Sequence, residues 1–373
     1  MSSPAGNGWR GGRPRIQVAL TAGLVGAALS LAACGDDEGG STTQASGSAE
    51  LSAIKQYLTE HTDNLAAEAA TMRQLGEEYY AVAEQSGFDY EALLEQHRPE
   101  VERILDQSKA AYAKANPAYE EMEGIVAGVP RLSQYDVDID AGSDASDPEN
   151  AVSYSLELPS GEMLKQPGNL FFVTETALYG TNPDFLAKGV EGDVNGDGKV
   201  DFGEALPDAN IYVSAVREFE EQAKSLDSDA AEFSATPSDA FTALTIMVPT
   251  MSEYFESWKN SRFVAGADFT EQAFVAASRL QDIADILGGL VVTYDQVRPM
   301  IAAESLQQAE QTGKALNDLV VYVEDLRDQE AEGKKFTAEQ ADTLGAEAQR
   351  QAEAIAGQVT QAAQRLGIEL QEA

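Results

Sequence analysis

Apolar residues recur at intervals of three and four through most of the chain after residue 50, and this spacing constrains its fold more than any other feature. In residues 51–85 the stripe consists of Leu51, Ile54, Leu58, His61, Leu65, Ala69, Met72, Leu75, Tyr79 and Val82. Such spacing places side chains on one face of an α-helix. A histidine within such a stripe is more often a core or boundary residue than a ligand. Residues 51–85 are therefore predicted to form a helix that buries one face.

Similar patterns predict further helices up to the C-terminal end. Residues 87–129 are predicted to form two or three helical runs, with breaks near Gly87, Pro99 and Pro117. Helices are also predicted within residues 169–180 and 209–226, after Pro237 and Pro249, over 270–301, and twice or three times over 302–368. The acidic residues 135–151 are predicted to be a loop.

A short β-hairpin is predicted at about residues 151–165. Val152, Tyr154, Leu156 and Leu158 alternate with polar residues, and a turn follows at residues 159–161. The expected fold class is therefore mostly α, with antiparallel helical bundles in two halves and one small hairpin.

The N-terminal segment has the pattern of an export signal. Three arginines precede an apolar stretch that ends in Leu31-Ala32-Ala33-Cys34. This ending resembles the bacterial lipobox, in which the cysteine is lipidated and becomes the mature N-terminus. We therefore expect a lipoprotein signal peptide at 1–33, a flexible tether at 34–50 that carries lipidated Cys34, and a folded domain at 51–373. The expected location is extracytoplasmic, with the lipid as the attachment to the bacterial membrane, in the periplasm or at the cell surface.

The chain is strongly acidic. Removing residues 1–33 would leave 22 basic and 63 acidic residues, a formal net charge of −41. Such a charge excludes nucleic acid as a partner and is compatible with collecting cations. A solubilising acidic surface accounts equally well for much of it.

Residues 193–204, DVNGDGKVDFGE, have the ligand spacing of an EF-hand calcium loop. The expected ligands are Asp193, Asn195, Asp197, the Lys199 carbonyl, Asp201 and Glu204, with Gly198 at the sharp turn. The flanking segments lack the two long helices of a paired EF-hand, and no second loop follows. We therefore interpret the loop as a structural Ca²⁺ clip.

Three further carboxylates lie on apolar helical patterns. They are Glu175, Asp282 and Asp285. A carboxylate on an apolar face is costly unless it is paired, capped or bound to a cation. Hydrogen bonding to arginine or to a helix N-terminus is the alternative to a metal site.

Four segments, taken in order, resemble the imelysin and EfeO-type family, which is associated with bacterial iron uptake. They are AYAKANPAYEEMEGIV at 111–126, LSQYDVDIDAG at 132–142, FFVTETALYG at 171–180 and SRLQDIADILGGL at 278–290. The resemblance extends over about residues 51–370. It implies a helical fold and a metal site that includes Glu175, Asp282 and Asp285. Phe172 occupies the position of the histidine in the family's His-x-x-Glu motif, so the imidazole ligand is missing. A site made of carboxylates alone suits Fe³⁺, Ca²⁺ or Mg²⁺ better than Zn²⁺.

The resemblance implies a lipid-anchored metal-binding component of an iron or other cation uptake system, with a metal permease or redox partner. Two alternatives stay open. One is a calcium-stapled scaffold or adhesion lipoprotein, which requires Glu175 to be capped and no cleft beside it. The other is a metal-dependent peptidase, for which the sequence offers no His-Glu-x-x-His or Gly-x-Ser-x-Gly motif. The sequence therefore favours a binding protein over an enzyme.

Overall fold

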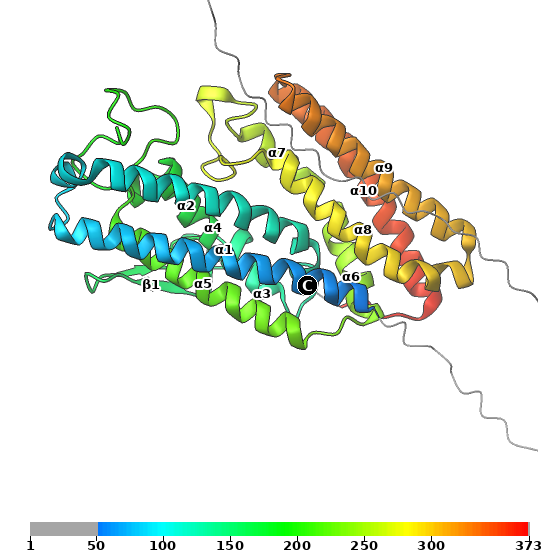
Figure 1. The fold of residues 1–373 in the computed structure, drawn as a ribbon. Helices are drawn as coiled ribbons and strands as arrows, with labels where there is room; N and C mark the ends of the chain where they lie inside the picture. The colour runs from blue at the N-terminus through cyan, green and yellow to red at the C-terminus, as the bar shows by residue number, and fades with distance from the viewer. Residues whose placement is uncertain (1–50, 372–373) are drawn as a thin grey trace, which may run out of the picture. The chain divides into compact units, whose positions relative to one another are not determined.

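The computed structural model describes residues 51–371 (Figure 1). The predicted signal peptide, the tether and the lipidated Cys34 lie outside the described residues. Within 51–371 the fold is mostly α-helical with one small hairpin, so the predicted fold class is confirmed. In this part of the chain, no helix combines the length and apolarity needed to cross a membrane.

The longer helices account for most of the fold. They are α1 (Ser52–Gln85), α2 (Tyr90–Val126), α4 (Leu170–Tyr179), α5 (Ala209–Glu232), α6 (Pro237–Met247), α7 (Met251–Asn260), α8 (Arg279–Glu304), α9 (Leu306–Ala331) and α10 (Ala338–Leu366). The short elements are α3 (Ser133–Asp136), the π-helical turn η1 (Val137–Ala141), β1 (Ser155–Glu157), β2 (Met163–Lys165), and the 3₁₀ turns η2 (Pro183–Phe185), η3 (Val248–Thr250) and η4 (Gly266–Asp268).

The helices pack in two groups that meet along α2 and α8. In the first group α1 packs against both α2 and α5, and α4 packs against α5. In the second group α8 packs against α9, and α10 packs against α6, α7 and α9. Figure 1 shows the first group in blue to green and the second in yellow-green to red. The contact between α2 and α8 joins the two groups, and the candidate site lies beside this contact.

Helix α1 buries the stripe that predicted it. Every member of the stripe is buried, His61 included. The His61 ring centroid lies 4.3 Å from that of Tyr57, and its Nδ1 lies 3.0 Å from a carboxylate oxygen of Glu121 on α2. His61 is therefore a boundary residue between two helices.

The predicted helix breaks at Pro99 and Pro117 are wrong, because both prolines lie inside the continuous helix α2. An internal proline removes one helical hydrogen bond and costs about 3 kcal/mol. Helix α2 packs along α1, α8, α4 and α6, and it buries half of its length in the core. This tertiary burial outweighs the local cost. Asp89 begins the helix by accepting a hydrogen bond from the Ala92 amide.

Two other boundaries also differ from the sequence prediction. Residues 135–141, part of the segment predicted as loop, instead belong to α3 and η1, and Asp136, Asp138 and Asp140 are buried there. Residues 270–278, predicted as the start of a long helix, precede α8 instead, and Ser278 caps that helix. The Glu175 carboxylate accepts hydrogen bonds from three backbone amides of this segment, and so competes with the carbonyls that would accept them in a helix. Both segments line the candidate site.

Candidate metal centre

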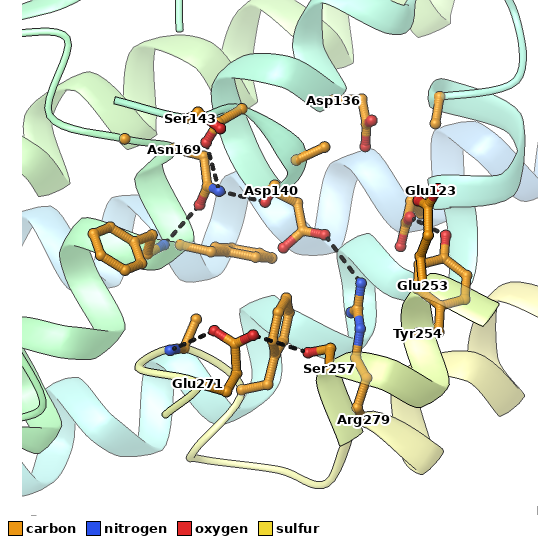
Figure 2. A pocket seen from close by; sticks show the side chains of 18 of the residues that line it. Glu123, Asp136, Asp140, Ser143, Asn169, Glu253, Tyr254, Ser257, Glu271 and Arg279 are labelled. Atoms are coloured by element: carbon orange, nitrogen blue, oxygen red, sulfur yellow. Dashed lines mark hydrogen bonds and ion pairs between the residues drawn. The ribbon is translucent and has the colours of Figure 1, made fainter. Parts of the chain in front are cut away.

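A cavity of about 760 Å³ lies where residues from α2, η1, α4, α7 and the segment before α8 converge. Within residues 51–371, its lining contains eight acidic residues and a single basic residue, Arg279. The acidic residues are Glu123, Asp136, Asp140, Asp144, Asp147, Glu175, Glu253 and Glu271. Aromatic rings of Tyr112, Phe171, Phe172, Tyr254 and Phe274 complete the walls. Figure 2 shows Glu271 and Ser257 on one side of the cavity and Asn169 on the other.

Three carboxylates meet beside the cavity, whose lining includes Glu123 and Asp140 but not Glu120. Glu120 and Glu123 lie three residues apart on one face of α2, and Asp140 comes from η1. One oxygen of each lies within 4.8 Å of the other two, and all three residues are buried. A helix aligns residues at i and i+3, whereas the wider π turn carries Asp140 toward them. Oxygen ligands in this arrangement suit a hard cation.

The carboxylates of the cluster are only partly satisfied by hydrogen bonds. Tyr254 donates its hydroxyl to Glu123 Oε1 at 2.7 Å, and Asn116 donates to Glu120 Oε1 at 2.9 Å. Glu123 Oε2 and Asp140 Oδ1 are buried and have no hydrogen-bond partner among the described residues. Buried polar atoms are nearly always hydrogen-bonded, because leaving one unpaired costs about 1–3 kcal/mol. These two oxygens are therefore free to bind a cation.

Arg279, in the first turn of α8, is the cation already present in this cluster. Its Nη1 lies 3.4 Å from a Glu120 oxygen and 3.3 Å from an Asp282 oxygen, and its Nη2 lies 3.9 Å from Asp140 Oδ2. The guanidinium also stacks on the ring of Phe274, 3.9 Å from the ring centroid, and on Tyr254 at 4.7 Å. Figure 2 shows Arg279 pointing toward Asp140. A single arginine cannot neutralise all of the surrounding carboxylates.

Burial raises the pKa of these acids. It raises the pKa of Asp140 to about 7, a shift that Arg279 opposes and the Glu123 charge increases. The pKa of Asp282 also rises to about 7, first through burial. Burial and the neighbouring Asp282 and Asp140 charges raise the pKa of Glu120 well above its usual range. Clustered carboxylates whose ionisation is suppressed in this way are typical of functional sites.

Glu175, one of the three predicted ligands, lies at the cavity wall and is held by backbone amides. Its carboxylate accepts hydrogen bonds from Phe274, Val275 and Ala276 at 2.7, 3.0 and 2.8 Å. Burial raises its pKa to about 7, and these three amides oppose the shift. Its oxygens therefore anchor the segment that leads into α8.

The other two predicted ligands point in different directions. Asp282 joins the cluster through Arg279, and its Oδ1 has no hydrogen-bond partner among the described residues. Asp285, one turn later, accepts a hydrogen bond from Gln281 at 2.7 Å and lies close enough to Tyr57 of α1 for its charge to raise the pKa of that phenol. The structure therefore brings Glu175 and Asp282 to the region of the cavity and places Asp285 toward α1.

The sequence prediction did not include Glu120, Glu123, Asp136 or Asp140 among the ligands. Glu120 and Glu123 lie in the first segment that resembles the family, and Asp136 and Asp140 lie in the second. The sequence feature that could have indicated Glu120 and Glu123 as ligands is their i, i+3 spacing on a helix with a long apolar face. The two segments are adjacent only because α3 and η1 fold back on α2, where Tyr119 donates its hydroxyl to Asp136.

The EF-hand-like loop forms a separate exposed turn. Asp193 accepts hydrogen bonds from the amides of Gly196 and Gly198 at 2.8 and 3.2 Å, and Asn195 accepts one from Asp197 at 2.8 Å. Asp197 accepts one from Lys199 at 2.9 Å, and Glu204 one from Asp201 at 2.9 Å. Arg98 and Lys109 of α2 donate to carbonyls of the loop. The loop is thereby fastened to α2.

Comparison with known families agrees with this geometry. A model of the imelysin family, also designated Peptidase M75, matches residues 100–361, which is more than half of the chain. The protein therefore belongs to the imelysin family, and the predicted family is confirmed. Members of this family are linked to iron uptake and are in general extracytoplasmic. None of the curated proteins compared with the chain matches it.

Proposed function

We propose that this protein is a lipid-anchored extracytoplasmic cation-binding component of an iron uptake system, and that the acidic cavity holds the cation. The observation that carries the proposal is the pair of buried, unpartnered oxygens, Glu123 Oε2 and Asp140 Oδ1, at the cavity. Membership of a family linked to iron uptake supports the same conclusion.

The chemistry of the lining favours a hard ion. The candidate ligands, Glu120, Glu123 and Asp140, offer oxygen only. Phe172, which replaces the family's histidine, lines the cavity with its ring. Fe³⁺ and other oxygen-preferring cations fit this set better than Zn²⁺, which favours nitrogen and sulfur. The acidic lining also concentrates cations near the opening.

The residues of the cavity favour a cation-binding protein over an enzyme. A metal-dependent peptidase needs an open metal position and a base placed beside it. The histidines in the described residues, His61 and His97, are absent from the cavity lining. The scaffold alternative requires a capped Glu175 and no cleft beside it. Three backbone amides do hold the Glu175 carboxylate, but Glu175 also lines the cavity. We therefore propose a carrier that delivers its ion to a permease or redox partner, with the lipid on Cys34 holding it at the membrane.

A second metal ion, Ca²⁺, is proposed at residues 193–204. The ligand spacing supports this proposal. The hydrogen bonds from Arg98 and Lys109 of α2 to carbonyls of the loop suit a structural role for the ion. Calcium there would fix the connection between α4 and α5.

The test separates the two sites by metal and by variant. The purified chain is stripped with a chelator, and iron and Ca²⁺ are titrated separately into the wild type, Glu204→Ala, and the double variant Glu123→Gln with Asp140→Asn. We expect Ca²⁺ to raise the melting temperature of the wild type and to lose this effect in Glu204→Ala. Iron binding is expected to survive in Glu204→Ala and to weaken at least tenfold in the double variant.

Two results would count against these proposals. Iron binding that is equally tight in the double variant would remove the cavity as the iron site. Absence of any calcium effect on the wild type would remove the clip. Exposed Glu162→Gln serves as the matched control, because its side chain has no hydrogen bond or ion pair in the structure.

A further inference from the structure

Arg279 occupies the position where a cation would meet the carboxylates. It is 4 % exposed, and Glu120, Asp140 and Asp282 surround its guanidinium. Glu123 and Asp140, both at least 95 % buried, line the cavity, and Glu123 Oε2 and Asp140 Oδ1 have no hydrogen-bond partner within residues 51–371. The cluster thus holds one internal cation and retains free oxygens for another.

The contacts of Arg279 are loose for a buried arginine. Its nitrogen–oxygen distances to the three carboxylates are 3.3, 3.4 and 3.9 Å. Charge-assisted hydrogen bonds between arginine and carboxylates are usually about 2.7–2.9 Å long and often paired. The Nε atom of Arg279 has no hydrogen-bond partner in the part of the chain that the structure describes. No carboxylate therefore fixes the guanidinium in the two-point geometry that makes such pairs strong.

The face of the guanidinium is held instead by aromatic rings. Phe274 and Tyr254 stack on it, and both rings line the cavity. Phe274 has a positive φ of 52°, a conformation that costs a non-glycine residue free energy. The neighbouring hydrogen bonds to Glu175 maintain this conformation. The two rings therefore hold the guanidinium by cation–π contacts at the cavity wall.

We infer that Arg279 is a built-in competitor for the bound cation, which neutralises the cluster in the unloaded protein and lowers its affinity for metal ions. This inference rests on the proposed function. A metal ion that binds Glu123, Glu120 and Asp140 must take carboxylate oxygens from the guanidinium or bind close to its positive charge. Both effects weaken binding, and both favour release of the ion to a partner.

The inference is tested with Mn²⁺, an oxygen-preferring ion that can be followed by electron paramagnetic resonance, and with Fe²⁺ under anaerobic conditions. Both ions are titrated into full-length protein that carries Glu204→Ala, so that the calcium-type loop does not contribute. Arg279→Gln is expected to bind both ions at least tenfold more tightly than the parent protein. Removing a positive charge within a few ångströms of a divalent ion lowers the repulsive Coulomb energy by more than the free energy of one pKa unit, which corresponds to a tenfold change in affinity.

Three further variants make the result specific. Arg279→Lys keeps the charge without the planar fork and is expected to bind with an affinity between those of the wild type and Arg279→Gln. Arg131→Gln removes an exposed positive charge outside the cavity lining and is expected to leave binding unchanged. In Arg279→Ala, millimolar guanidinium is expected to raise the melting temperature and to compete with Mn²⁺, whereas methylammonium at the same concentration does so less.

The possible outcomes separate this inference from the proposed function. If the parent protein binds Mn²⁺ or iron and Arg279→Gln binds no more tightly, the competitor role is refuted and the metal centre remains. If neither protein binds either ion, both proposals fail. If Arg279→Gln does not fold, Arg279→Ala decides, because guanidinium that fails to compete with Mn²⁺ in that variant refutes the inference.

Discussion

Glu175 is expected to stabilise the fold chiefly by holding the segment before α8, and Glu175→Gln tests this. The carboxylate has two oxygens for three amide donors, with Val275 and Ala276 on Oε1 and Phe274 on Oε2. A glutamine can keep one oxygen for Val275 and Ala276, but it places an amide N–H₂ group against the Phe274 amide. One donor is then left unsatisfied, which costs about 1–3 kcal/mol.

The Phe274 backbone adds to this cost. Its φ of 52° is maintained by the contact with Glu175 and by stacking on Arg279. We therefore expect Glu175→Gln to lower the free energy of unfolding by about 2 kcal/mol. Glu175→Ala removes the acceptor for all three amides and is expected to cost at least about 4 kcal/mol.

Urea unfolding at pH 8 measures both changes, because this pH lies above the Glu175 pKa of about 7. Glu162→Gln, at an exposed hairpin turn, is the control and is expected to change stability by less than about 0.5 kcal/mol. Hydrogen exchange supplies a local readout, since the amides of residues 274–276 should lose protection in Glu175→Gln before the rest of α8 does. A destabilisation below about 0.5 kcal/mol with unchanged protection would refute the anchoring role.

Two further predictions concern pH and helix packing. In the metal-free protein, burial raises the folded-state pKa of Asp140, Asp282 and Glu175 to about 7, whereas unfolded carboxyls titrate near about 4. Between about pH 4 and about pH 7 the folded state therefore holds more protons than the unfolded state. The free energy of unfolding should fall as the pH rises from about 4 to about 7, by up to about 1.4 kcal/mol per pH unit for each proton. Unfolding curves measured in chelator that show stability rising over this range would contradict the prediction. At the α2–α8 contact, a Cβ on Gly289 would lie 2.3 Å from the Glu121 carbonyl, whereas one on Gly288 meets nothing within 4 Å. Gly289→Ala should therefore cost about 1–3 kcal/mol and Gly288→Ala should gain up to about 1 kcal/mol; equal melting temperatures for the two variants would argue against this packing.

The sequence was sufficient for the helices whose pattern is local. The stripe in α1, the start of α6 at Pro237 and the turn between the hairpin strands each depend on neighbouring residues. Prediction failed where a distant residue decides the local conformation. Pro99 and Pro117 stay helical because other helices cover α2, and residues 270–278 stay out of α8 because Glu175, about 100 residues earlier, binds their amides.

The candidate site shows the same limit. The calcium-type loop has all of its proposed ligands within residues 193–204, so its pattern is visible in the sequence. The cavity instead combines Glu123 of α2, Asp140 of η1 and Arg279 of α8. No local pattern links these positions. Only the packing of α2 against α8 and the return of residues 133–141 to α2 bring them together.

The resemblance to the family implies that Phe172 stands at the position of its histidine, and this has a consequence for the choice of ion. The Phe172 ring lies 6.0 Å from the Phe185 ring in an edge-to-face contact, and a Cβ added at Gly168 would lie 2.9 Å from it. This position is thus part of a packed aromatic wall that also lines the cavity. In the proposed metal site, which lacks an imidazole, selectivity would come from the charge and number of the carboxylate oxygens, and nearby Arg279 would reduce that negative charge by one. The proposed site would therefore discriminate by the charge of the ion more than by its softness, which would favour Fe³⁺ over softer divalent metals.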